Sequence, residues 1–211
     1  MRVQRQQVED AVIGAGIVDS LDDMHLIHRP GMAAVIWRRQ PLMEFQVWID
    51  DLDPAVLPDA RLILQPYTVR EAVSHLCDQA GMPGGKHRDM FVDDVAALAD
   101  GFAATMATPY LRLRLDVVND NACRKFHMDA VTARLVCTYR GTGTQYGISS
   151  DGGDPKRVYT VPAGSPIILR GTRWPDAPPS GLLHRSPPIE GTGETRLVLV
   201  LDPVCDPETA V

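Results

Sequence analysis

The sequence predicts an α+β protein in which helices pack on an antiparallel, jelly-roll-like core. Two observations carry this prediction. Apolar residues recur at helical spacing before about residue 109, and after it they alternate with polar residues, as in half-buried strands. The chain of 211 residues also contains 17 Gly and 17 Pro, which favours a loop-rich β architecture over a helix bundle.

The first half is predicted to be mainly helical. Three segments have helical periodicity, at 41–52, 68–81 and 89–107. The last is the longest, and its spacing turns one apolar stripe inward, made of Val92, Val95, Leu98, Phe102 and Met106. A short extended piece at 33–39 precedes the first helix.

The second half is predicted to be a series of short strands. In the segment 110–118, leucines alternate with Arg112, Arg114 and Asp116, so these three polar side chains share one face. Further strands are expected at 131–139, 158–161, 166–171, 181–186 and 195–202, separated by turn-rich segments that include 140–147. We therefore divide the chain into a helical part (1–108) and a jelly-roll core (109–211). No flexible linker joins them, so we expect one folding unit.

Composition and charge exclude several classes of protein. The net charge of −6 argues against a nucleic-acid binder, and no apolar stretch reaches the roughly 20 residues that span a membrane. The four cysteines are scattered and form no CxxC pair, and the first residues lack the apolar run of a signal peptide. We expect a cytoplasmic protein with reduced thiols, acting on a small molecule or a protein side chain.

The motif His127-Met128-Asp129 is the first candidate for a functional site. Residues two apart on a strand point to the same face, so this imidazole and this carboxylate could hold one metal ion. An isolated H-x-D is common by chance, but His184 follows within another predicted strand. Two histidines and one carboxylate leave coordination positions open for substrate and oxygen, as in non-haem Fe(II) oxygenases.

Arg196 is the second candidate, because it opens the last apolar strand, 12 residues after His184. A guanidinium among Leu and Val is costly to bury unless an anion meets it. A carboxylate-bearing cosubstrate would satisfy it. The alternative is a structural salt bridge with Glu194 or Asp202.

Taken in order, "FHMD", "PAGSPIILRG", "HRSPP" and "TRLVLVLD" resemble the pattern of Fe(II)/2-oxoglutarate dioxygenases on a double-stranded β-helix, over residues 109 to 203. The whole chain also resembles the domain-of-unknown-function 1826 family. The dioxygenase resemblance implies that His127, Asp129 and His184 bind iron and that Arg196 binds the distal carboxylate of 2-oxoglutarate. One position departs from the pattern, because Val198 stands where a serine is often found.

Three further residues complete the predicted site. Tyr139 could offer its hydroxyl to the cosubstrate carboxylate, and Arg112 and Arg114 could line the substrate mouth. Two alternatives stay open. The chain could be a cupin-like protein that binds zinc or nickel without redox turnover, with Cys123 or Cys137 near the ion. It could also be a metal-free scaffold whose helices bind a protein partner.

Overall fold

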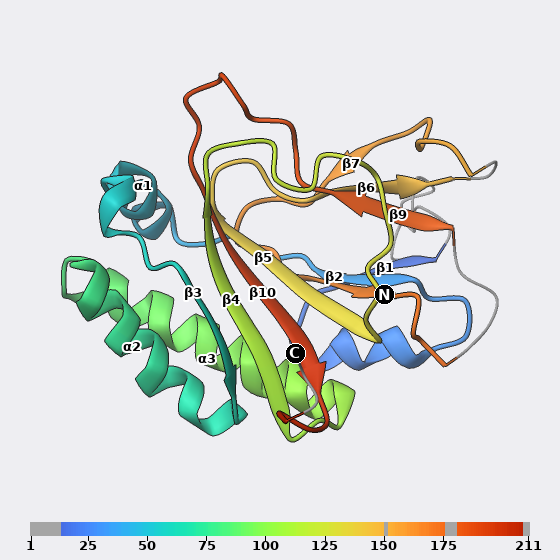
Figure 1. Cartoon of the computed structure of the whole chain (residues 1–211), viewed down its shortest axis with the longest axis horizontal. Coiled ribbons are helices and arrows are strands. Elements are labelled where there is room, and N and C mark those ends of the chain that lie inside the picture. Colours follow the sequence, from blue (N-terminus) through green and yellow to red (C-terminus); the bar gives the residue numbers. More distant parts are fainter. Residues whose placement is uncertain (1–13, 150–151, 176–180, 209–211) are drawn as a thin grey trace, which may run out of the picture.

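The computed structural model of the protein describes residues 14–149, 152–175 and 181–208. Its strands form two sheets that face each other (Figure 1). The large sheet has the order β1-β2-β8-β5-β10-β4-β3, formed by β1 (Ala15–Val18), β2 (Ala34–Trp37), β8 (Ile167–Arg170), β5 (Ala133–Arg140), β10 (Arg196–Val204), β4 (Tyr110–Val118) and β3 (Ala60–Leu64). The small sheet has the order β7-β6-β9, formed by β7 (Tyr159–Thr160), β6 (Gln145–Ile148) and β9 (Leu182–Arg185).

The chain winds between the two sheets as a jelly roll does. From β4 in the large sheet, the chain crosses to a bridge beside β9 of the small sheet and returns to β5 of the large sheet. It then forms β6 and β7 in the small sheet, β8 in the large sheet, β9 in the small sheet and finally β10 in the large sheet. All neighbours are antiparallel except β1 and β2. This alternation confirms the predicted jelly-roll, double-stranded β-helix core.

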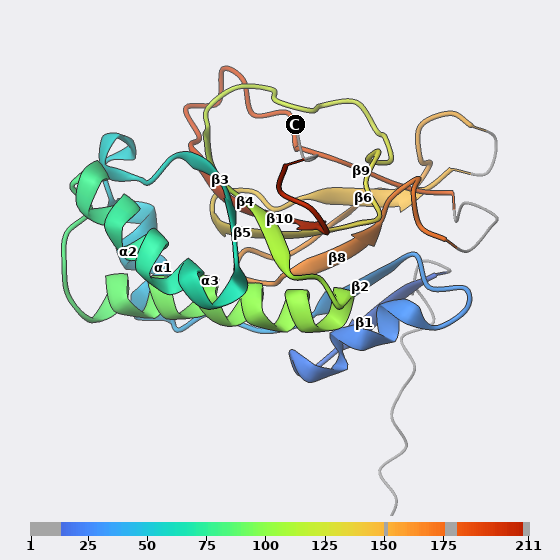
Figure 2. The same cartoon turned by 60° about the horizontal axis from the view of Figure 1, so that its bottom comes forward.

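The helices cover the face of the large sheet that points away from the small sheet (Figure 2). They are α1 (Met43–Asp51), α2 (Val69–Ala80) and α3 (Lys86–Met106), with short 3-10 turns η1 (Asp22–His28), η2 (Pro54–Val56) and η3 (Pro66–Thr68). The predicted inward stripe of α3 is buried at Val92, Val95, Leu98 and Phe102 and partly buried at Met106. None of the helices in the described ranges combines the length and apolar character needed to cross a lipid bilayer.

The fold has two hydrophobic cores, one on each face of the large sheet. Because successive side chains of a strand point to opposite faces, the position of a residue along its strand decides which core it enters. On β10, Leu197, Leu199 and Leu201 pack toward the helices, whereas Val198 and Val200 belong to the core between the sheets. The leucines of β4 likewise face the helices. Arg112, Arg114 and Asp116 therefore lie on the inner face of the large sheet, as their alternation predicted.

The structure extends the prediction in one respect and corrects it in another. The first 108 residues contain all the helices named above, and they also supply β1, β2 and β3 to the large sheet. The segment 140–147, expected to be a turn, contains the start of β6. The backbone of Gly143 in this segment lies close to the backbone of Val161, since a Cβ at Gly143 would lie 1.8 Å from the carbonyl oxygen of Val161. Glycine thus serves close strand approach here as well as turning.

Candidate metal and cosubstrate site

The structure brings together the three side chains that the sequence singles out. One potential ligand atom each from His127, Asp129 and His184 lies within 4.8 Å of the others. The backbones of His127 and His184 form an antiparallel bridge with reciprocal hydrogen bonds of 3.0 Å. The segment carrying His127 thus extends the small sheet beyond β9, which places both imidazoles side by side, with ring centroids 4.6 Å apart. That they bind a metal stays a prediction.

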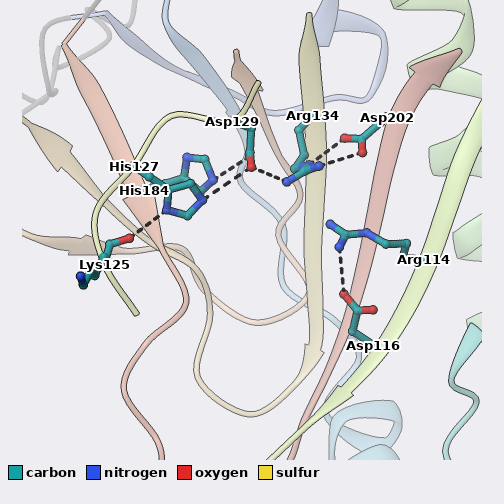
Figure 3. A network of polar contacts seen from close by, with 8 residues as sticks. All are labelled: Arg114, Asp116, Lys125, His127, Asp129, Arg134, His184 and Asp202. Atoms are coloured by element: carbon teal, nitrogen blue, oxygen red, sulfur yellow. Dashed lines mark hydrogen bonds and ion pairs between the residues drawn. The ribbon is translucent and has the colours of Figure 1, made fainter. Parts of the chain in front are cut away.

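Backbone contacts orient His127 and Asp129. The Nδ1 of His127 lies 2.8 Å from the carbonyl oxygen of Lys125, which can only accept, so Nδ1 donates and Nε2 faces Asp129 (Figure 3). The carbonyl of Asp129 accepts from the amide of Thr172 at 2.9 Å. Gly171 makes this contact possible, because a Cβ there would lie 2.0 Å from the carbonyl oxygen of Val131. Asp129 itself lies in a loop, not on the extended strand that the parity argument assumed.

Arg134 fixes the carboxylate of Asp129, and the sequence analysis missed it. Its Nη1 donates to Asp129 Oδ1 at 2.5 Å, while Nε and Nη2 donate to both oxygens of Asp202 at 2.7 and 2.8 Å (Figure 3). Asp202 is 2 % exposed. The available signal was strand parity, since Arg134 lies on β5 on the same face as Val136, which belongs to the core between the sheets.

The charges of the site are set by burial and by mutual contact. Burial alone would raise the pKa of Asp129, but His127, His184 and Arg134 outweigh it and hold that pKa well below its usual value. Contact with Asp129 raises the pKa of His127 against the opposing effect of burial. Burial lowers the pKa of His184, more than contact with Asp129 raises it. A carboxylate and a neutral imidazole therefore face each other near neutral pH.

The arrangement fits a divalent ion. His184 Nε2 lies 2.9 Å from Asp129 Oδ2, and His127 Nε2 lies 3.5 Å from Oδ1. Nevertheless, Oδ2 is buried and has no hydrogen-bond partner of acceptable geometry in the described residues. Two ligands bound to a first-row ion at about 2.1 Å and at right angles would lie about 3.0 Å apart. A short distance without a hydrogen bond is what a shared cation would produce.

Arg196 is buried without a carboxylate partner in the described residues. It is 1 % exposed, and its Nε donates to the carbonyl of Thr142 at 2.6 Å while Nη2 donates to Thr138 Oγ1 at 3.3 Å. The predicted alternative of a structural salt bridge is wrong. Asp202 pairs with Arg134, and Glu194 accepts from the amide and hydroxyl of Thr142. Burial lowers the pKa of Arg196 to about 10, so the group is still charged at neutral pH.

Tyr139 lies on the other face of the large sheet, which corrects its predicted place in the cosubstrate site. Its hydroxyl donates to Asp94 Oδ2 on α3 at 2.6 Å, and its ring packs edge-on against Phe91. Arg39 completes this group through two hydrogen bonds to Asp94, of 2.5 and 2.7 Å. Cys137 faces the same way and is fully buried, so it is not near the triad.

A cavity of about 330 Å³ connects the two histidines of the triad with Arg196. Its lining includes His127, His184, Arg134 and Arg196, together with an apolar stretch formed by Val136, Val198 and Val200. Arg114 and Cys123 line the same cavity, whereas Arg112 does not. The size is at the lower end of the range for small-molecule sites.

Sequence comparison assigns the family. The model described as "Protein of unknown function (DUF1826)" matches residues 18–202, which is most of the chain. The chain belongs to the DUF1826 family. No curated protein matches it in sequence.

Comparison with solved structures finds oxygenases at low similarity. The dioxygenase for auxin oxidation from rice has a TM-score of 0.49 and 12% identity, over 93% of this chain and 84% of that one. The 2-oxoglutarate complex of dioxygenase for auxin oxidation 1 from Arabidopsis thaliana has a TM-score of 0.47 and 12% identity, over 95% of both chains. An oxidoreductase of the 2OG-Fe(II) oxygenase family from Burkholderia pseudomallei has a TM-score of 0.44 and 13% identity, over 89% of this chain and 94% of that one. At these scores, the functional argument rests on the DUF1826 site itself.

Proposed function

We propose that this DUF1826 protein is a non-haem Fe(II)/2-oxoglutarate-dependent oxygenase. The observation that carries the proposal is one cavity lined both by the two histidines of a His-Asp-His cluster and by a buried guanidinium that has no carboxylate partner in the described residues. His127, Asp129 and His184 would hold the iron, and Arg196 would bind the distal carboxylate of 2-oxoglutarate. When bound, the iron and the cosubstrate supply the oxidising chemistry; the protein positions them and excludes water.

The inner face of β10 supports this division of roles. Arg196 begins the strand, and Asp202, which holds Arg134 beside the triad, lies six residues further along it. Val198 and Val200 lie between them and line the cavity, so a cosubstrate reaching from the triad toward Arg196 would cross an apolar wall. Thr138, the register partner of Val198, brings its hydroxyl to Arg196. This hydroxyl offers the polar contact that Val198 itself lacks.

The described residues have defined tasks in this proposal. Neutral His184 offers a lone pair because burial disfavours its protonation. His127 presents Nε2 because Lys125 engages Nδ1. Arg134 holds Oδ1 of Asp129 and leaves the buried Oδ2 for the ion. With three protein ligands, a bound ion would keep coordination positions open for the cosubstrate and for oxygen.

The alternative is a divalent-metal site without redox turnover, binding zinc or nickel. The same donors suit several first-row metals, and Cys123 lines the cavity as a softer potential ligand. Cys123 is exposed and is not part of the cluster of three, which favours the oxygenase proposal.

The test is an anaerobic titration of the metal-free protein with Fe(II) and then 2-oxoglutarate. We expect one iron per chain and a visible absorption band when the cosubstrate chelates it. Arg196→Gln should keep the iron and weaken 2-oxoglutarate by roughly tenfold to a hundredfold, the value of a lost charge-assisted contact. Tight zinc or nickel binding with no effect of 2-oxoglutarate would support the alternative instead.

A further inference from the structure

Arg114 is a further, partly buried cation in the cavity, and the metal and cosubstrate site does not use it. It lies on the inner face of β4, and its side chain is 19% exposed. Its Nε is buried without a hydrogen-bond partner in the described residues. The nearest anion is Asp116, two residues along the same strand, at 3.8 Å from Nη1. This contact is too long for a hydrogen bond.

The other three arginines of this cavity are engaged by the protein. Arg134 donates three hydrogen bonds to Asp129 and Asp202. Arg185 donates to Gln145 Oε1 at 2.8 Å and stacks on Phe126. Arg196 donates to Thr142 and Thr138. Because a buried donor without an acceptor costs free energy, the unused donors of Arg114 point to a missing acceptor.

The position of Arg114 relative to the triad fits a substrate group, not the cosubstrate. Its register partner on β10 is Val200, whose partner on β5 is Val136. Neighbouring strands lie about 4.8 Å apart, so Arg114 and the β5 strand that carries Arg134 are separated by roughly 10 Å. Arg196, which is proposed to bind the cosubstrate, lies four residues before Val200 on β10, opposite Val118. Figure 3 shows the Arg114 guanidinium on the triad side of the large sheet, beside Asp202 and Arg134.

We propose that Arg114 binds an oxyanion of the primary substrate, and that the substrate is a small organic acid or phosphate ester. A guanidinium matches a carboxylate or phosphate with two parallel hydrogen bonds. The cavity of about 330 Å³ suits a small molecule, with the reacting carbon held between Arg114 and the triad. Asp116 would not block this contact, because its carboxylate is partly exposed and can turn to solvent when the ligand binds. This inference rests on the proposed function and names its substrate class.

The test measures binding, not turnover. The zinc-loaded protein, saturated with 2-oxoglutarate, is titrated with benzoate and with inorganic phosphate, and benzamide serves as the neutral counterpart of benzoate. Thermal shift and ligand-observed NMR give the affinities. Arg61→Gln is the matched control, because Arg61 is the exposed register partner of Arg114 on β3 and does not line the cavity.

We expect the wild type to bind benzoate or phosphate and not benzamide. Arg114→Gln should lose roughly tenfold to a hundredfold in that affinity, and Arg61→Gln should lose less than about twofold. Arg114→Lys keeps the positive charge but lacks the paired N–H donors of a guanidinium, so its affinity should lie between those of the wild type and Arg114→Gln. This variant preserves the test if Arg114→Gln is poorly folded. Equal binding of benzoate and benzamide, no oxyanion binding, or binding that survives Arg114→Gln would overturn the inference.

Failure of the proposed function is distinguishable from failure of this inference. If the wild type takes up neither metal nor 2-oxoglutarate, the proposed function fails, and the same titrations on the metal-free protein still test Arg114. If the oxyanions compete with 2-oxoglutarate and depend on Arg196 but not on Arg114, they occupy the cosubstrate site and the inference is wrong.

Discussion

The two faces of the large sheet differ in how completely their arginines are paired with carboxylates. On the helix side, Arg39 forms two hydrogen bonds with Asp94, which also accepts from Tyr139. On the inner side, Arg134 is paired with Asp129 and Asp202, but buried Arg196 and partly buried Arg114 have no carboxylate within hydrogen-bond distance in the described residues. Burying a charge is costly on both faces. A pair completed within the chain serves the architecture, whereas an incomplete one indicates a ligand.

The same contrast holds for the carboxylates. Both oxygens of Asp94 accept hydrogen bonds from side chains on the helix side. Asp129 has one oxygen bound by Arg134, while the other is buried and accepts no hydrogen bond from the described residues. The helix-side group should therefore control stability, and the inner group should control ligand binding. Four experiments test this separation of roles.

The largest effect is expected for Asp129→Ala. Loss of the carboxylate ligand should weaken metal binding by at least about a thousandfold, more than the loss of an outer contact does. The fold should survive, because Arg134 keeps its two hydrogen bonds to Asp202. Metal content after dialysis and the melting temperature are the measurements. A variant that unfolds, or that keeps its metal, would contradict the assignment.

Asp94→Ala should have the opposite effects, lowering the stability of the fold and leaving metal binding unchanged. It leaves Arg39 and Tyr139 without their shared carboxylate, and breaking a buried pair costs about 3 kcal/mol. In a chain of this length, the melting temperature should fall by roughly 6–12 °C. Metal affinity should be unchanged, because the large sheet separates this group from the triad. A parallel loss of metal would show that the two faces are coupled.

Arg134→Gln should weaken metal binding by about tenfold to a hundredfold, as expected for a residue that orients a ligand. It frees Oδ1 of Asp129 and leaves buried Asp202 without its partner. Arg134→Lys keeps the charge but cannot bridge both carboxylates, so it separates orientation from charge. Calorimetric metal titration gives both affinities. Unchanged affinity in both variants would remove Arg134 from the site.

The smallest effect concerns pH. The pKa of His127 is raised above 6.5, so this imidazole is the ligand that protons occupy first as pH falls. The pKa of His184 and that of Asp129 are both lowered, so neither takes up a proton in the same range. Metal affinity should therefore fall by roughly tenfold per pH unit below the His127 pKa, as one proton competes. If the pH dependence of metal affinity showed two competing protons, His184 would also be protonated in this pH range.

Most strands of the jelly-roll core could be predicted from the sequence, and the three triad residues could be singled out, because their signals are local. Alternation along 110–118 gave β4 and its inner polar face, and the segments around His184 and Arg196 were found as strands β9 and β10. These patterns depend only on a period of two, which each segment carries by itself. Strands β1 and β3 were missed because they are short and lie among helical segments.

Tyr139 and Arg134 show what local sequence patterns cannot predict. Both lie on β5, and parity alone says that they point to opposite faces, but it does not say which face meets the small sheet. Tyr139 was predicted to lie in the site, but it lies on the helix side, whereas Arg134, which was not predicted, contacts Asp129 in the site. The deciding contact with Asp202 spans 68 residues of chain.

Most strands of the jelly-roll core, the H-x-D motif and an arginine that opens the final strand can be recognised from the amino-acid sequence. Long-range contacts in the folded chain pair His127 with His184 across a bridge and let Asp202 hold Arg134, so that Asp202 does not neutralise Arg196. They also leave the buried Nε of Arg114 without an acceptor in the described residues. A period fixes the direction of a side chain relative to its own strand. Whether a buried charge finds its partner depends on which strands become neighbours.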